Sequence, residues 1–150
     1  MTYLNFGKTT LYLSSIMDLY NREIVAYTIS DTQDNDLVLE TLINQLDLES
    51  GVLLHSDQGS VYTSHAYYLA CIEKGITRSM SRKGTPADNA CIKWFHSALK
   101  TETFYLQDRR KHNKDSITNS VKNYITFYNE TRIQRHFKNQ SPVQFRKLVS

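Results

Sequence analysis

A carboxylate follows directly on a short apolar run, in the segment of residues 53–60. The run at residues 52–56 is short and apolar enough to form a buried central strand. Asp57 would then lie at the carboxyl end of a strand, where ligands of α/β proteins usually bind. Each of the two polar residues also has a simpler interpretation. Asp57 would only begin a turn that Gly59 closes. His55 would only pack within the sheet. Asp57 is therefore a candidate whose role depends on what lies beside it.

A polar loop at residues 80–87 precedes a strong helical pattern that Asp88 is expected to cap. Helical spacing gathers the polar side chains of this helix into one stripe, made of Asn89, Lys93, His96 and Lys100. A polar stripe is usually a solvated face. This one follows a loop that carries Arg82 and Lys83, and we expect it to lie beside the strand that ends in Asp57. It could equally line a phosphate-binding cleft.

The chain contains five distinctive motifs: His-Ser-Asp-Gln-Gly-Ser-x-Tyr at 55–62, Arg-Lys-Gly-x-x-x-Asp-Asn-Ala at 82–90, Leu-Lys-Thr-Glu at 99–102, Tyr-Asn-Glu-Thr-Arg at 128–132 and Ser-Pro-Val-Gln-Phe at 141–145. Together they resemble the catalytic core of bacterial insertion-sequence transposases, a group similar to retroviral integrases. The resemblance covers the whole chain. It implies an α/β, ribonuclease-H-like fold with a mixed five-stranded sheet flanked by helices. It also implies an Asp-Asp-Glu triad that holds two divalent ions, Mg²⁺ or Mn²⁺.

The triad of this family cleaves DNA and joins strands, because two metal ions roughly 3.5–4 Å apart clamp the attacking and leaving oxygens. Hard cations of this kind prefer carboxylate oxygens. The resemblance assigns Asp57 to the second carboxylate and places the third after thirty-five intervening residues, where this chain has Lys93. The first carboxylate belongs to a Thr-Asp-x-Thr-Tyr motif, of which residues 1–3 match only the last three places. We therefore expect one domain, residues 1–150, truncated just after the first catalytic Asp position.

Two other acids are poor substitutes for the missing carboxylates. Asp18 lies in a segment that resembles the structural hairpin turn of the family. Asp88 precedes Lys93 by five helical positions, which rotate it about 140° away around the helix axis. Of the triad, only Asp57 remains.

Two classes of function follow from the incomplete triad. The first is a transposase or integrase core that acts on DNA by metal-dependent phosphoryl transfer, either with a triad at residues other than those assigned here or with other acids in place of the missing ones. The second is a non-catalytic DNA-binding remnant, or a dominant-negative regulator of an intact transposase. An RNA-directed nuclease of the same fold would need the same missing carboxylates. The sequence favours a transposase lineage and a catalytically defective copy, because Lys93 argues against binding of Mg²⁺ or Mn²⁺.

Charge is divided unequally along the chain. Residues 1–72 hold two basic and nine acidic side chains, a balance of −7, whereas residues 73–150 hold sixteen basic and six acidic ones, a balance of +10. A basic surface of this kind usually faces a polyanion, although the two halves could also neutralise each other. We expect DNA as the partner, with contacts from Arg82, Lys83, Asn89, Lys100, Arg132 and Arg135.

The length of 150 residues, with 40% hydrophobic and 22% charged side chains, is that of one globular domain. The two cysteines form no zinc or disulfide pattern, and no apolar run is long enough to span a membrane. We expect a soluble bacterial protein of the cytoplasm, with no membrane partner and with a homo-oligomer left open. Strands are expected at residues 2–6, 10–19, 23–30, 52–56 and 76–79, and helices at 34–48, 64–74, 88–102, 116–130 and from Pro142.

Overall fold

The computed structural model describes residues 1–6, 8–43, 51–82, 85–103 and 113–149, so the predicted DNA contact Lys83 lies outside the described part. Along the chain the elements are β1 (Thr2–Phe6), β2 (Thr9–Met17), β3 (Ile24–Ser30), α1 (Asn35–Ile43), β4 (Leu53–Ser56), α2 (His65–Glu73), β5 (Thr77–Met80), η1 (Pro86–Asn89), α3 (Ala90–Glu102), α4 (Lys114–Glu130), η4 (Arg135–Phe137) and α5 (Pro142–Val149). None of the helices within these residues is long and apolar enough to cross a bilayer. The fold class predicted from the sequence, α/β, is confirmed.

The five strands do not join into one mixed sheet, which corrects the prediction. β1, β2 and β3 form an antiparallel sheet in that order, and β4 and β5 form a separate parallel pair. Within the described residues β1 pairs only with β2, from Thr2 opposite Leu13 to Phe6 opposite Thr9. β2 continues for residues 14–17 beyond this pairing, bonded to β3 alone. Within the described residues no ladder joins β1 to β4, so the two sheets stay separate.

The run at residues 52–56 forms β4, but not as a buried central strand. Leu53 is 64% exposed, and the other β4 residues are only half-buried. β4 bonds to β5 and to no other described strand, so it forms an edge. A short run such as residues 52–56 has the same composition at an edge as in the centre of a sheet, which is why its burial was predicted wrongly.

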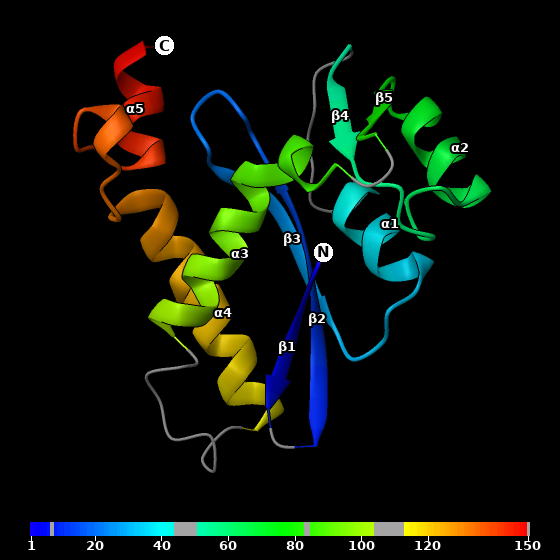
Figure 1. Ribbon diagram of the computed structural model, residues 1–150, viewed down its shortest axis with the longest axis horizontal. Coiled ribbons are helices and arrows are strands. Elements are labelled where there is room, and N and C mark those ends of the chain that lie inside the picture. The colour runs from blue at the N-terminus through cyan, green and yellow to red at the C-terminus, as the bar shows by residue number, and fades with distance from the viewer. Residues whose placement is uncertain (7, 44–50, 83–84, 104–112, 150) are drawn as a thin grey trace.

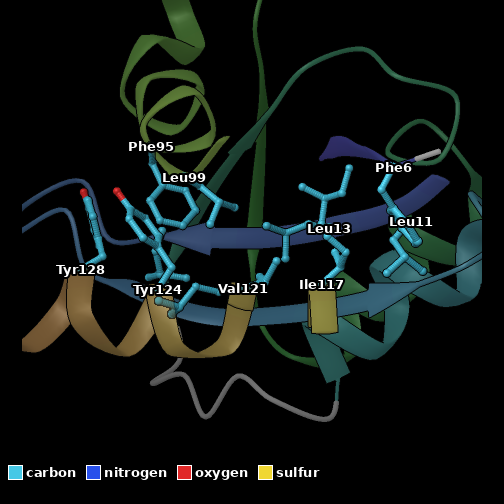
Figure 2. Close-up of a cluster of buried hydrophobic side chains, with 12 residues drawn as sticks. Phe6, Leu11, Leu13, Phe95, Leu99, Ile117, Val121, Tyr124 and Tyr128 are labelled. Atoms are coloured by element: carbon cyan, nitrogen blue, oxygen red, sulfur yellow. The ribbon is translucent and has the colours of Figure 1, made fainter. Parts of the chain in front are cut away.

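Helices cover both faces of the three-stranded sheet, α3 and α4 on one side and α1 on the other, and α2 packs beside α1 and β5 (Figure 1). The α3–α4 side holds the larger cluster of buried side chains, including Leu11 and Leu13 from β2, Phe95 and Leu99 from α3, and Val121, Tyr124 and Tyr128 from α4 (Figure 2). The second cluster combines Val38 and Leu42 of α1 with Val61, Tyr67 and Cys71. Successive side chains of β2 and β3 point to opposite faces of the sheet, so the same two strands contribute to both clusters.

Local signals in the sequence place most helix ends correctly. Ser64 caps α2 by accepting a hydrogen bond from the Tyr67 N–H. α4 begins at Lys114, two residues before the predicted start, because Asn113 forms a capping box with Ser116. The prediction that Asp88 caps α3 is wrong. It lies in the short turn η1 and bonds to Arg82 instead, so α3 begins after Asn89 without a side-chain cap.

Candidate functional site

Asp57 lies directly after β4, exposed to solvent, at the start of a tight turn. Its Oδ1 accepts a hydrogen bond of 2.9 Å from the Gly59 N–H. A Cβ at position 59 would lie 2.9 Å from the same oxygen, so only glycine fits this turn without displacing Asp57. The turn interpretation of Asp57 and Gly59 is therefore correct locally, and it holds the carboxylate in a fixed position at the end of the strand.

The start of β1, the end of β4 and the start of α3 meet around the amino group of Met1. This nitrogen donates to the Tyr62 hydroxyl at 3.3 Å. Burial lowers the pKa of the Met1 amino group, the charge of Asp57 raises it, and that of Lys93 lowers it. Burial, and then the charge of Asp57, raises the pKa of Tyr62 to about 12. Asp57 and Lys93 therefore act on the same small region, although they are 36 positions apart in the sequence.

His96, a member of the predicted polar stripe, does not face solvent. It is 6% exposed, and its Nε2 lies 2.8 Å from the Ser15 hydroxyl on β2. Burial, and then the positive charges of the Met1 amino group and Lys100, lower the pKa of His96 to about 3. The imidazole is therefore neutral at physiological pH and fixes α3 to the central strand of the sheet.

His55, on β4, also serves the structure. Its Nδ1 lies 3.0 Å from the Ser79 hydroxyl on β5, where the two residues are paired in the ladder. Its Nε2 is buried without a hydrogen-bond partner. This imidazole links the two strands, as its packing interpretation predicted.

The predicted DNA contacts lie in different settings. Arg82 is exposed but bonds to Asp88, with 3.3 Å between Nη2 and Oδ1. Lys100 and Asn89 are half-buried on or beside α3, and burial lowers the pKa of Lys100. Arg135 is exposed in η4. A DNA phosphate would therefore have to compete with Asp88 for Arg82, whereas Arg135 is accessible.

Arg132, another predicted DNA contact, is held by side chains of the protein. Its Nε and Nη2 donate to both carboxylate oxygens of Glu102, at 2.5–3.2 Å. Glu102 also accepts a 2.9 Å bond from the Tyr124 hydroxyl. The guanidinium carbon lies 4.9 Å from the centre of the Trp94 ring. These contacts join α3 to the end of α4, and the predicted role of Arg132 toward phosphate remains a prediction.

Asn129 is a structural residue to which sequence reasoning assigned no role. Its side-chain NH₂ donates to the Ile24 carbonyl, and its Oδ1 accepts from the Ile24 N–H, both at 2.9 Å. The amide thereby provides hydrogen-bond partners for the Ile24 N–H and carbonyl, as a neighbouring strand would. The signal was present in the Tyr-Asn-Glu-Thr-Arg motif, in which Tyr128 is fully buried and Arg132 pairs with Glu102. In the described structure this motif fastens α4 to the sheet and to α3.

We expect Arg132→Ala to lower the free energy of unfolding by about 1–2 kcal/mol, the combined range for a partly exposed ion pair and a cation–π contact. The Arg132 hydrogen bond is the main reason why the pKa of Glu102 lies below its usual value. A carboxylate with a lowered pKa stabilises the fold at pH values above the pKa that this group has in the unfolded chain. The stabilisation is lost as the pH falls through the pKa of the group in the folded chain. The destabilisation by Arg132→Ala, measured by urea unfolding, should therefore shrink below about pH 4.

Arg135→Ala is the matched control for this prediction, since it removes an exposed guanidinium three residues away. It should change stability by less than about 0.5 kcal/mol. Equal effects of the two substitutions at neutral pH would contradict the structural role of Arg132.

Comparison with known families decides the lineage. Residues 1–86 match the integrase core domain family, and residues 93–149 match a second description of the integrase core domain. The chain belongs to the integrase core domain family. This integrase core is 37% identical over 139 residues to the putative transposase InsK for insertion sequence element IS150 of Escherichia coli K12, covering 91% of this chain and 48% of InsK. It is 34% identical to the transposase for insertion sequence element IS904 of Lactococcus lactis, covering 100% of this chain and 60% of that protein.

The integrase core thus spans about half to three-fifths of the length of these two relatives. A transposase-like protein of Haemophilus influenzae is 36% identical over 97% of this chain and 68% of its own length. The insertion-sequence transposase resemblance found in the motifs is confirmed.

Solved structures support the same fold. The catalytic core domain of BIV integrase matches with a TM-score of 0.72 at 15% identity, covering 99% of this chain and 92% of that one. A chain of the simian T-cell lymphotropic virus intasome matches with a TM-score of 0.82 at 18% identity, covering 96% of this chain and 51% of that chain. At such low identity these matches show the fold alone, and they place it among integrase cores.

Proposed function

We propose that this integrase core acts on DNA within an insertion-sequence transposition system, and that this copy binds DNA without cleaving it. The lineage supports the first part, since curated relatives are named transposases of insertion sequences. The second part rests on one observation: position 93, on α3 and near Asp57, is a lysine and not a carboxylate.

Divalent metal is implied by the family, and one solved integrase core, that of HTLV-2, is in complex with magnesium. The residues of this chain do not fit such an ion. Within the described part of the chain, no three side chains of the types His, Cys, Asp and Glu gather where they could hold a metal. Near Asp57 the side chain of Lys93 is a cation, and a cation at this place opposes the binding of another cation. A metal-dependent step is therefore not part of the proposed function.

DNA binding without cleavage is compatible with two roles, a decayed remnant and a dominant-negative regulator of an intact transposase. A regulator must occupy the same DNA, or assemble with the intact enzyme. The charge balance of +10 in residues 73–150 supports binding to DNA. Co-expression with an intact relative separates the roles, because a regulator lowers the transposition frequency and a remnant leaves it unchanged.

Binding to a random DNA duplex should be weak, with a Kd of about 10⁻⁴–10⁻⁶ M, and should weaken steeply as salt is added. Each phosphate contact that is removed lowers the slope of log K against log salt by about one. We expect this loss for Arg135→Ala, since Arg135 is exposed in the basic half. Lys8→Ala is the matched control, because Lys8 is exposed but lies in the acidic half. Fluorescence anisotropy at several salt concentrations measures both slopes, and a flat salt response would refute DNA binding.

A further inference from the structure

The chain has one tryptophan, Trp94, and this residue lies on α3 directly after Lys93. The buried side of α3 consists of Phe95, His96, Ala98 and Leu99. Trp94 itself is 45% exposed. A large ring at this position adds little to the core, so its solvent-facing surface is available to a ligand.

One side of the Trp94 ring is covered by the Arg132 guanidinium, 4.9 Å from the ring centre. The guanidinium is itself fixed by its two-pronged contact with Glu102, which Tyr124 also holds. A ring packed against a fixed group loses little conformational entropy when a ligand stacks on it. The protein therefore presents a rigid aromatic surface that needs no rearrangement before binding.

The surroundings of the ring suit a nucleic acid. Lys93 is exposed and adjacent in the chain, and the Arg132 guanidinium lies against the ring itself. A flat aromatic ring beside cations is the arrangement by which proteins bind single strands, with bases stacked on the ring and phosphates near the cations. Bases inside an intact duplex are already stacked on their neighbours, so their faces are not accessible to a side chain.

We propose that Trp94 is a stacking platform for an unpaired DNA base, which gives this integrase core a preference for single-stranded DNA or frayed strand ends. The inference rests on the proposed function, since it assumes that DNA is the partner. It adds the form of DNA that is recognised and the residue that recognises it.

Because Trp94 is the only tryptophan, its fluorescence, excited where tyrosine does not absorb, reports on this position alone. We expect a short oligothymidine to quench this fluorescence strongly. An abasic oligonucleotide of the same length carries the same phosphates without bases, so it should bind through the cations and quench little. Equal quenching by the two oligonucleotides would overturn the proposal, and this test needs no variant.

Trp94→Leu should weaken binding of oligothymidine roughly five- to 150-fold, the loss that follows from removing one stacked base. Its binding to the abasic oligonucleotide should stay unchanged, which also shows that the variant is folded. Trp94→Phe keeps an aromatic face and should lose less. If Trp94→Leu binds oligothymidine as tightly as the unmodified chain, stacking is refuted while salt-dependent DNA binding stands. If neither oligonucleotide nor duplex binds, the proposed function itself fails.

Discussion

In a polypeptide of residues 1–150, Mg²⁺ or Mn²⁺ is expected to bind only after two changes are made together: Lys93→Glu, and the addition before Met1 of the Thr-Asp pair of the family motif. The first change replaces an ammonium by a carboxylate, which alters the local charge by two units. The second supplies a further carboxylate at the start of β1, close to Asp57 and Lys93. Three carboxylates are the usual donors for hard divalent ions at a site of this type.

The unmodified chain should show no metal-dependent cleavage or strand joining, and Lys93→Glu alone should not restore it. The doubly changed chain should bind Mn²⁺ first and perform weak, unspecific nicking at most. Lys93→Gln in the extended chain is the matched control, since it removes the cation without adding a ligand. Isothermal calorimetry measures the binding, and a supercoiled plasmid reports nicking. Nicking by a nuclease-free preparation of the unmodified chain, lost in Asp57→Asn, would show that the triad has been assigned wrongly.

Acid is expected to destabilise the fold through His96 by about 3 kcal/mol between pH 7 and pH 4. In the unfolded chain this imidazole takes up a proton near its ordinary pKa of 6.5, whereas burial lowers the pKa in the folded chain to about 3. Below pH 6.5 the unfolded state therefore binds more protons. The free energy of unfolding falls by about 1.4 kcal/mol per pH unit as pH decreases through this range.

His96→Gln isolates this effect, because an amide can replace the imidazole toward the Ser15 hydroxyl but does not take up a proton. The difference in unfolding free energy between the variant and the unmodified chain should change with pH along the slope given above. His65→Gln, which removes an exposed imidazole from α2, is the matched control. Urea unfolding from pH 7 to pH 4 measures all three chains. Parallel curves for His96→Gln and the unmodified chain would contradict a buried neutral His96.

Much of the fold could be predicted because local sequence patterns determine several of its strands and helices. The hairpin of β2 and β3 follows from two runs of β-branched and aromatic residues around a turn. The structure confirms that Asp18 belongs to this turn, where its Oδ1 accepts a 2.8 Å bond from the Tyr20 N–H. The helices α2 and α4 follow from periodicity and from polar caps. These elements depend mainly on residues close to each other in the sequence.

Other features depend on distant partners and could not be read from the sequence. The guanidinium of Arg132 looked available to phosphate, because nothing in the sequence shows that Glu102, thirty residues away, accepts its hydrogen bonds. His96 belonged to a polar stripe by spacing, yet it is buried because Ser15 of β2 lies opposite. Asp88 was expected to cap a helix, but an arginine six positions earlier provides a stronger partner for its charge. In each case a tertiary contact outweighs the local pattern.

The two apolar clusters on opposite faces of the sheet also affect how the protein fluctuates. Asp57 follows the short edge strand β4, between Leu54 and Val61 of the α1–α2 cluster, whereas α3 carries Lys93 and packs into the α3–α4 cluster. Packed units of this kind open separately and at different free energies, and elements with exposed edges open first. Transient opening of the β4 side would therefore move Asp57 away from Lys93 while the α3–α4 cluster stays folded. How close Asp57 and Lys93 lie therefore depends on how firmly the two apolar clusters pack against the sheet.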